Sequence, residues 1–540
     1  MADVTRGCVL PGLMILSAQP LAADDEEELS LLSARQVLGG RYFWILFVYS
    51  VLLLSATGVI AARRHLWWDE VEVSYIAQLG AMKDIARALN AGLDWQPPTY
   101  YIPLSYLTKW FGASSLVLRS VAILPYWLAT LIIYFAVARR TSPMHGFLAM
   151  LLPTVTLAFN YSFEARPYAL MLFFSACAFL FWQFTQEKRY RRGALAGLAL
   201  SLAAAFAVHY NACLVAVPLL AGEAIRAARR RALDFPVLIS IACCAAPAIV
   251  LYPNMLAHRN LVVVPAYLPL ANRTLSAYKN LFSDAGVLGL GTLAILIVWF
   301  AWPRLNCGER RVVVSKFEML PLAVSGVFLL IPAMFSVVSH FTQTFYPRYV
   351  LESVIGASIF LGLAVHGVSR AAPRLSAVLL TVLAAAAIVV VGVRLHAPDE
   401  IEWGTFGDYS DLFDRNAEAV YDSADPILLG QGSYMIALRY GDEDLRKRAI
   451  HPLDDTPSEM PGYNLSDRVT FKYLERLLPG ELRVPDYSAF KQTYRQFLMY
   501  DPDAWIVDRL LADGAEIKLQ KALHRRPLYA VSVKARTSPM

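Results

Sequence analysis

Residues 63–110 read RRHLWWDEVEVSYIAQLGAMKDIARALNAGLDWQPPTYYIPLSYLTKW and lie between two strongly apolar runs of the chain. Two tryptophans, Trp67 and Trp68, precede two adjacent carboxylates, Asp69 and Glu70, and a proline turn follows. Aromatic and charged residues between apolar runs are typical of a loop at a membrane surface. The stretch therefore predicts that Asp69 and Glu70 form half of an active site, with other parts of the chain opposite them.

An amphipathic helix is predicted directly after the two carboxylates. Its apolar residues recur at three- and four-residue steps: Tyr75, Ile76, Leu79, Met82, Ala86 and Leu89. Such a helix can lie flat in the membrane interface. Asp69 and Glu70 stand just before it, where a helix N-terminus favours negative charge. A simple capping role for Asp69 is the alternative to a functional one.

The composition indicates an integral membrane protein. Of 540 residues, 57% are hydrophobic and 17% charged, a balance typical of polytopic membrane proteins with some water-exposed mass. The sequence has no zinc-ligand spacing, P-loop or sustained basic and aromatic pattern, so nucleic acid is not expected as a partner. The six cysteines lie outside the long polar stretches, which favours buried thiols over a disulfide framework.

Apolar runs, several of which approach the roughly 20 residues that span a bilayer, predict about eleven transmembrane helices. The runs are 43–62, 115–138, 144–160, 167–185, 193–208, 212–225, 236–253, 286–303, 318–338, 349–368 and 375–393. The two runs beside His209 are short, so a re-entrant or tilted pair is an alternative there.

Basic residues cluster in alternate loops, which predicts the orientation of the helices. The clusters are Arg139-Arg140, Lys188 to Arg192, Arg226 to Arg231, Arg304 to Lys316, and Arg370 with Arg374. All five lie on the cytoplasmic side if the N-terminus is inside. Residues 1–40 are then a cytoplasmic tail, and the protein is a multi-pass protein of the inner (plasma) membrane. A cleaved signal peptide ending near Ala23 is the alternative, and it would invert this topology.

The chain divides into the tail, a transmembrane domain over 41–395 with its first outer loop at 63–114, and a C-terminal domain over 396–540. Short apolar runs in the last part predict strands at Pro426–Leu429, Trp505–Val507 and Leu528–Val533. Helical patterns at Ser433–Tyr440 and Val469–Leu478 alternate with them. A small α/β domain outside the membrane is expected.

Two further groups of residues at outer helix ends bear charge. Glu164 and Arg166 stand in the turn Tyr161–Tyr168, and Arg348 stands in Phe345–Tyr349. Charges amid apolar sequence are costly, so they pair with each other or face a wet cavity. A guanidinium suits phosphate. Structural pairing of Glu164 with Arg166, and snorkelling of Arg348 to lipid headgroups, are the alternatives.

Four motifs, taken in this order, resemble the GT-C glycosyltransferases. They are Trp68-Asp69-Glu70 after the first membrane helix, the Gln96–Tyr101 turn, the Glu164–Tyr168 turn and Arg348-Tyr349. Most similar are the protein O-mannosyltransferases and the bacterial transferases that move aminoarabinose to lipid A. The resemblance covers about 41–395 and implies an all-α polytopic GT-C bundle with an outward juxtamembrane helix. The C-terminal α/β domain matches only in type.

The resemblance also implies an activity and its partners. The expected enzyme transfers a hexosyl or pentosyl group from a polyprenyl-phosphate sugar to a hydroxyl of a glycolipid, polysaccharide or protein on the outer (periplasmic) face. The family's first-loop aspartate, matched by Asp69, acts as or near the catalytic base. The family turn matched by 96–101 usually begins with Lys or His, whereas Gln96 is uncharged, which leaves its role open.

Roles for the remaining residues follow from joining the resemblance to their chemistry. Asp69 and Glu70 are predicted to be catalytic, and Arg348, Arg166 and Tyr349 to bind the donor phosphate. The predicted substrate-binding residues are Glu164, Tyr168, Gln96, Tyr100, Trp68 and His209. No cofactor or metal site is predicted, and a divalent cation remains compatible with the residues. A transporter, which would have two halves with matching broken helices, and a receptor with an outer ligand-binding domain are the alternatives.

Overall fold

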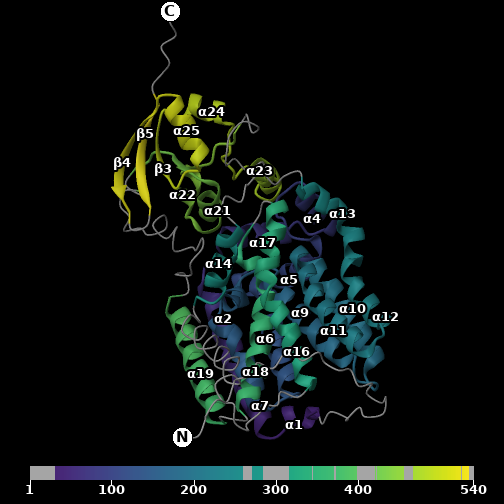
Figure 1. Cartoon of the computed structure of the whole chain (residues 1–540). Coiled ribbons are helices and arrows are strands. Elements are labelled where there is room, and N and C mark those ends of the chain that lie inside the picture. The colour runs from purple at the N-terminus through teal and green to yellow at the C-terminus, as the bar shows by residue number, and fades with distance from the viewer. Residues whose placement is uncertain are drawn as a thin grey trace, which may run out of the picture. The chain divides into compact units, whose positions relative to one another are not determined.

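The computed structural model describes residues 31–259, 270–283, 316–342, 345–369, 373–397, 420, 423–454, 466–523 and 526–533. All helices and strands below belong to the unit formed by residues 32–540 (Figure 1). Within the described residues, Cys177, Cys213, Cys243 and Cys244 are free thiols. Cys8 and Cys307 lie outside them.

Seven helices in the described residues are long and apolar enough to cross a membrane. They are α2 (Arg41–Arg63), α6 (Ser115–Ala138), α10 (Arg191–Val208), η4–α11 (Tyr210–Arg230), α12–α13 (Phe235–Ala257), α16–α17 (Met319–His340) and α19, within Pro373–His396. Two shorter apolar helices, α9 (Tyr168–Phe184) and α18 (Glu352–Ser369), match two more predicted runs. The predicted run 286–303 lies outside the described residues, so the count of eleven stays a prediction.

The predicted run 144–160 is not one straight helix. Its first part, α7 (Pro143–Leu151) with η2 (Leu152–Val155), meets α8 (Leu157–Asn160) and η3 (Tyr161–Phe163) at a bend of 70°. Pro153 removes a backbone donor at the bend, and Thr156 is extended with φ −129° and ψ 171°. The bend redirects the chain into the turn that contains Glu164 and Arg166.

The first loop contains two helices where one amphipathic helix was predicted. Helix α3 (Trp68–Ala77) and helix α4 (Met82–Asn90) are separated at Gly80, whose φ of 79° favours glycine. Asp69 and Glu70 lie in the first turn of α3 rather than before it. All residues of α3 from Asp69 to Ala77 are buried, so only α4 has the predicted polar and apolar faces. The proline turn then forms η1 (Pro98–Tyr100) and continues as α5 (Tyr101–Phe111).

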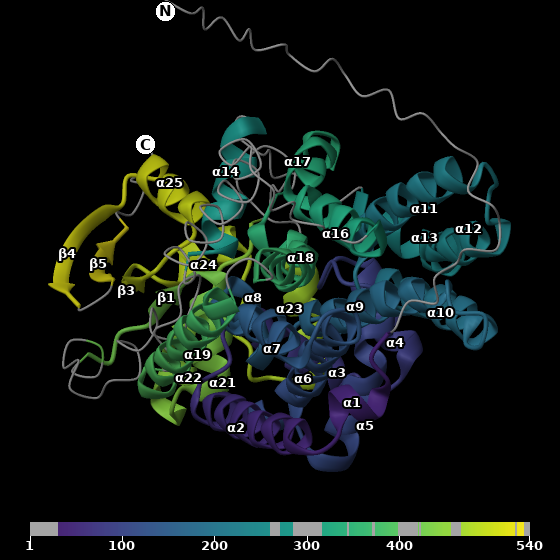
Figure 2. The ribbon, with the colours of Figure 1, turned by 60° about the horizontal axis from the view of Figure 1, so that its bottom comes forward.

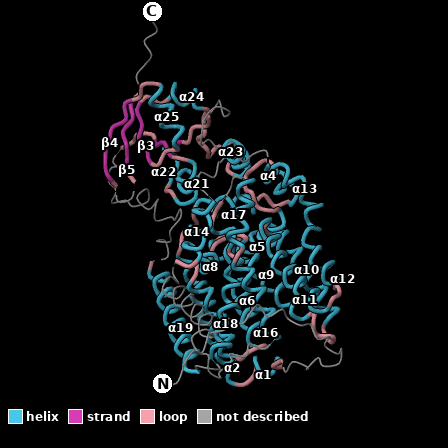
Figure 3. Tube along the Cα trace, in the orientation of Figure 1, coloured by secondary structure: helices cyan, strands magenta, loops and turns pink. Residues whose placement is uncertain are grey.

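The C-terminal domain is a mixed five-stranded sheet with helices, and Figure 3 shows its strands in magenta. The strands are β1 (Ile427–Leu429), β2 (Ala449–Ile450), β3 (Gln496–Tyr500), β4 (Glu516–Ala522) and β5 (Pro527–Ser532), in the order β2-β1-β3-β5-β4. Strand β1 pairs in parallel with β2 and β3, whereas β5 pairs antiparallel with β3 and β4. The helices are α21 (Gln431–Tyr440), α22 (Glu443–Arg448), α23 (Ser466–Leu477), α24 (Tyr487–Thr493) and α25 (Ala504–Ala512). The predicted α/β class is confirmed.

One predicted strand of this domain is wrong. Residues 505–507 begin helix α25, because Trp505, Ile506 and Leu510 are the buried side of a helix rather than one face of a strand. Strand β4 was not predicted, since most of its side chains are exposed and its sequence alternates charged with apolar residues. The predicted strands at 426–429 and 528–533 and the predicted helices at 433–440 and 469–478 match β1, β5, α21 and α23.

Helices α10 to α13 form one group beside α9, and Figure 2 shows them close together away from α2 and α19. Helix α2 packs on α6, and helix α18 packs on α7 and α16. A large apolar core runs through this bundle and includes Phe159, Phe163, Phe179 and Trp182. The charged residues described next lie where the first turn of α3, the segment before η1, the 164–167 turn and η6 (Pro347–Val350) come together.

Candidate active site

Asp69 lies between two arginines that come from distant parts of the chain. Its Oδ2 atom is 3.5 Å from Nη2 of Arg166 and 3.9 Å from Nη2 of Arg348. Asp69 and Arg166 are buried, whereas 19% of the Arg348 side chain is exposed. The structure thus brings together three predicted site residues from separate parts of the chain: Asp69 from the first loop, Arg166 from the Tyr161–Tyr168 turn and Arg348 from the Phe345–Tyr349 turn.

A second carboxylate, Asp94, completes this group and was not predicted. Its Oδ2 atom is 3.4 Å from Nη1 of Arg166 and accepts a 2.6 Å hydrogen bond from the Tyr101 hydroxyl. Its Oδ1 atom accepts a 2.7 Å hydrogen bond from the backbone N–H of Trp95. Arg166 is therefore held between Asp69 and Asp94, and Asp94 fixes the orientation of its guanidinium.

Glu70 points to a different partner from Asp69. Arg119, in helix α6, donates from Nε and Nη2 to the two carboxylate oxygens of Glu70 at 2.8 and 2.6 Å. The backbone N–H of Ala165 donates to the same carboxylate at 2.7 Å. Arg119 also donates to the carbonyl oxygens of Ala61, Arg64 and His65 at the end of α2. Both oxygens of Glu70 are thus occupied, and the pair joins α2, α3, α6 and the 164–167 turn.

The sequence left open a structural ion pair between Glu164 and Arg166. In the structure Glu164 pairs with another residue, Arg64. Its Oε1 atom lies 3.3 Å from Nη1 of Arg64, and both side chains are buried. Arg64 looked like one of two basic residues at a membrane helix end, and Arg119 was a single charge in an apolar run. An isolated arginine amid apolar residues was the available signal for Arg119, because such a charge needs a buried partner.

Aromatic rings surround the arginine that is partly exposed. The Arg348 guanidinium lies over the rings of Tyr346 at 4.5 Å, Tyr349 at 5.9 Å and Trp67 at 6.0 Å. Trp67 therefore contacts this group, whereas Trp68, a predicted substrate-binding residue, is half-buried against the apolar core around α3. Cations over aromatic faces are held favourably, which orients Arg348 without neutralising it.

The other predicted aromatic residues form a wall beside Arg348. The ring of His209 lies 5.3 Å from that of Tyr168 and 5.4 Å from that of Tyr349. Tyr100 stacks edge-on against Tyr101 at 5.3 Å. Gln96 is buried. Tyr168, Tyr349 and His209 thus adjoin the charged group directly, and Tyr100 adjoins it through Tyr101.

Several buried polar atoms in this group have no hydrogen-bond partner among the residues that the structure describes. They are Asp69 Oδ2, Arg166 Nε, Arg348 Nε, Tyr168 Oη, Tyr100 Oη and Trp67 Nε1. Buried polar groups are normally hydrogen-bonded, and those left over mark places where a ligand or water binds. Donors outnumber acceptors here, which suits a ligand with several acceptor oxygens.

Burial and charge set the protonation of these groups. Burial raises the pKa of Asp69 above its ordinary value, against the attraction of Arg166 and Arg348. Burial alone would also raise the pKa of Glu70, but Arg119 outweighs it and holds that pKa below the ordinary value. Burial, with the nearby arginines 166 and 348, lowers the pKa of His209 to about 3, so this histidine is neutral. Asp69 is therefore the more basic of the two adjacent carboxylates.

Comparison with known proteins supports the GT-C resemblance. Residues 95–254 match the family model of dolichyl-phosphate-mannose-protein mannosyltransferases. The crystal structure of ArnT from Cupriavidus metallidurans bound to undecaprenyl phosphate is similar, with a TM-score of 0.52 and 12% identity over 94% of this chain and 100% of that one. The apo structure of the same ArnT is 13% identical, with a TM-score of 0.39 over 91% of this chain and 98% of that one.

A search of curated protein sequences found no match. The bound ArnT structure aligns over nearly the whole chain and so includes the bundle, the first loop and the C-terminal domain. Together with the family match, it confirms the predicted resemblance: the chain has the fold of the GT-C membrane glycosyltransferases.

Proposed function

We propose that this protein transfers a sugar from a polyprenyl-phosphate donor to an acceptor hydroxyl at the outer face of the membrane. The observation that carries the proposal is the position of Asp69 between Arg166 and Arg348. One carboxylate with a raised pKa and two guanidiniums with unused donors are the groups that such a transfer needs. The similarity to ArnT bound to undecaprenyl phosphate and the mannosyltransferase family match support the donor class.

The reaction follows from the roles of these groups. Asp69 takes the proton of the acceptor hydroxyl while the oxygen of that hydroxyl forms a bond to the anomeric carbon of the donor sugar. The bond between that carbon and the phosphate oxygen breaks, and the electron pair leaves with the polyprenyl phosphate. Arg348 and Arg166 stabilise the negative charge on the departing phosphate. A single displacement of this kind inverts the anomeric centre.

The remaining residues have supporting roles in this proposal. Glu70 positions α3 and the 164–167 turn through Arg119 rather than reacting itself, because its two oxygens are already bound. Asp94 orients Arg166. Tyr168, Tyr349, His209 and Trp67 form the aromatic wall against which a sugar ring packs. These assignments revise the predicted roles of Glu70 and Trp68.

We further propose that the transfer needs no divalent cation. Arg166 and Arg348 already supply two positive charges where the leaving phosphate develops its charge. EDTA-treated protein should therefore keep its rate, and restoration of a lost rate by Mg²⁺ or Mn²⁺ would contradict this.

The proposed orientation has the N-terminus in the cytoplasm, and the site and C-terminal domain outside. It rests on the basic residues that cluster in alternate loops.

The test is a transfer assay with purified full-length protein and defined polyprenyl-phosphate sugars. Asp69→Asn should lower the transfer rate by about 10²- to 10⁴-fold, the usual contribution of a general base. Asp84→Asn is the matched control, because Asp84 is a partly exposed residue in the same loop, and its carboxylate pairs with the exposed Arg87. Nearly full transfer by correctly folded Asp69→Asn protein would overturn the proposal. Mass spectrometry of lipid-linked and envelope glycans with and without the protein identifies the sugar.

A further inference from the structure

The C-terminal α/β domain contacts the segment that leads into the acidic residues of the site. This segment, residues 64–67, connects the end of α2 to the first turn of α3. The backbone N–H of Leu66 donates a 2.8 Å hydrogen bond to the hydroxyl of Tyr440, the last residue of α21. The ring of His65 lies edge-on against the Tyr440 ring at 5.0 Å. A residue far along the sequence thus fixes the backbone three positions before Asp69.

Helix α3 is buried because α21 and α23 cover it. Val71, Val73 and Ile76 of α3 belong to the same apolar core as Tyr434, Met435 and Leu438 of α21 and Phe471 and Leu474 of α23. The sequence predicted that this helix lies in the membrane interface. The shared core explains why α3 is covered by protein instead. Its second side faces protein in place of lipid headgroups.

Polar contacts fix the register of the two parts. Arg439, next to Tyr440, donates a 2.8 Å hydrogen bond to the carbonyl of Ala113 after helix α5. The hydroxyl of Thr470 in α23 lies 3.4 Å from a carboxylate oxygen of Glu72 in α3. The contact therefore includes specific polar bonds, one within α3 and one to the chain after α5, and is not only an apolar cover.

The 64–67 segment is held from two sides. Arg119 binds its carbonyl oxygens at Arg64 and His65, whereas Tyr440 binds its N–H at Leu66. The first contact comes from the membrane bundle and the second from the C-terminal domain. Both contacts therefore act on the segment that enters the first turn of α3, where Asp69 lies.

We propose that Tyr440 is a positioning residue for the transfer reaction, through which the C-terminal domain sets the place of Asp69. This inference rests on the proposed function of Asp69 as the base. Removing residues 396–540 would strip the cover from α3 and disturb the site itself. Substitutions in the full-length chain are therefore needed to separate the two parts.

The variant Tyr440→Phe removes one oxygen and keeps the ring, so the apolar core stays filled. It should lower kcat about five- to tenfold, the effect of one hydrogen bond. The Kd for the donor should change by less than about twofold, because Arg166 and Arg348 are untouched. A split between kcat and donor binding separates positioning from a general loss of structure.

The matched control is Tyr434→Phe on the same helix. The Tyr434 hydroxyl accepts a 2.7 Å hydrogen bond from the backbone N–H of Arg483, so the same kind of bond is lost within the C-terminal domain. This variant should keep the wild-type kcat. Equal losses of kcat in the two variants would overturn the proposal, and so would an unchanged kcat in Tyr440→Phe.

Hydrogen–deuterium exchange gives a readout that needs no activity. Amide exchange over residues 64–70 should be faster in Tyr440→Phe than in the wild type or Tyr434→Phe, because the Leu66 amide loses its acceptor. Unchanged exchange over these residues would refute the coupling, whatever reaction the protein performs. An inactive wild type would instead refute the proposed function, while the exchange data would still decide whether Tyr440 holds the segment.

Discussion

The Nη2 atom of Arg348 lies 3.9 Å from Oδ2 of Asp69, within ion-pair range but beyond hydrogen-bond distance. The Nε atom of this guanidinium has no hydrogen-bond partner among the described residues, so it is available to another acceptor. The side chain is also the more exposed of the two arginines beside Asp69. These properties fit the proposed role of Arg348 in binding the donor phosphate.

The first prediction concerns how Arg348 binds that phosphate. Arg348→Lys keeps the charge but loses the planar two-donor geometry and the stacking on Tyr346. The Kd for a polyprenyl phosphate should rise about tenfold, roughly 1.4 kcal/mol. Equilibrium binding of the lipid phosphate measures this, and Arg87→Lys at an exposed surface pair is the control. Equal binding by Arg348→Lys and the wild type would remove Arg348 from the phosphate site.

The second prediction concerns pH. Because burial raises the pKa of Asp69, the base becomes protonated as pH falls through that raised value, and kcat/KM should fall with it. His209, with a pKa lowered to about 3, is neutral over the working range and should not contribute. Profiles from about pH 4 to 8 for wild type and His209→Gln should therefore show the same acid limb. A limb that disappears in His209→Gln would make the histidine, and not Asp69, the titrating group.

The sequence predicted those residues of the candidate site that stand at helix ends. Asp69, Arg166 and Arg348 each follow or precede an apolar run. The apolar runs and the basic clusters in alternate loops together predicted that these three residues lie at the same membrane face. Asp94 gave no such signal, since a single aspartate before a proline turn resembles any loop residue. Its importance comes from its contacts with Tyr101 and Arg166, which bring the segment before η1 next to the 164–167 turn and could not be read from the sequence.

The sequence was less informative about α3. Periodicity showed apolar residues on one side of the 75–89 region, and the simplest partner for a single apolar side is the membrane. It could not show that residues after 430 supply α21 and α23 as a protein cover. The break at Gly80, and the contact of Trp67 rather than Trp68 with Arg348, were not predicted from the sequence either.

The third prediction concerns the Glu70–Arg119 pair. Glu70→Gln leaves Arg119 as a fully buried charge, so the free energy of unfolding should fall by about 3–5 kcal/mol. Because the pKa of Glu70 is lowered in the fold, its stabilisation is present above the unfolded-state pKa and is lost as pH falls through the folded-state pKa. Thermal unfolding at several pH values measures this. Unfolding of Glu70→Gln at the wild-type temperature would show that the pair is not structural.

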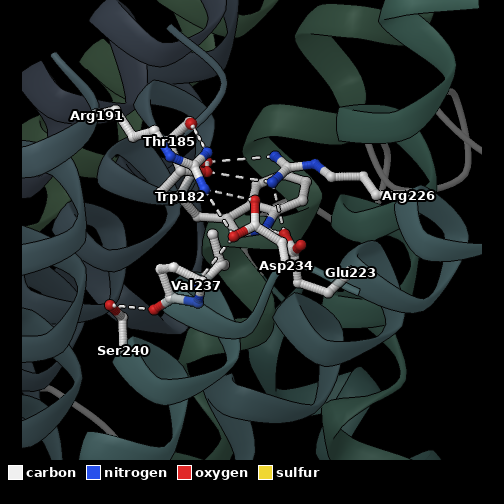
Figure 4. Close-up of polar contacts among 9 residues, drawn as sticks. Trp182, Thr185, Arg191, Glu223, Arg226, Asp234, Val237 and Ser240 are labelled. Carbon is white, nitrogen blue, oxygen red and sulfur yellow. Dashed lines mark hydrogen bonds and ion pairs between the residues drawn. The ribbon is translucent and has the colours of Figure 1, made fainter. Parts of the chain in front are cut away.

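The last prediction concerns a buried cluster away from the active site, shown in Figure 4. Glu223 accepts 2.6 Å hydrogen bonds from Arg226 and from the indole N–H of Trp182, and the Arg226 guanidinium lies 4.2 Å from the centre of the Trp182 ring. Nearby, Arg191 binds both carboxylate oxygens of Asp234, which precedes α12. The buried Glu223–Arg226 pair thus joins α11 to α9 through Trp182. The Arg191–Asp234 pair joins α10 to the start of α12.

The polar groups of this Glu223 and Arg226 cluster are hydrogen-bonded to one another, so we expect the cluster to have a structural role. Glu223→Gln should lower the free energy of unfolding by about 3 kcal/mol, because Arg226 loses its buried counter-charge. The folded protein should keep the wild-type kcat and donor Kd, since none of these residues forms an ion pair with Asp69, Arg166 or Arg348 in the part of the chain that the structure describes. Glu443→Gln, at a fully exposed pair with Lys447, is the control and should leave unfolding unchanged. A Glu223→Gln protein that unfolds like wild type but has lost transfer would instead place this cluster in the reaction.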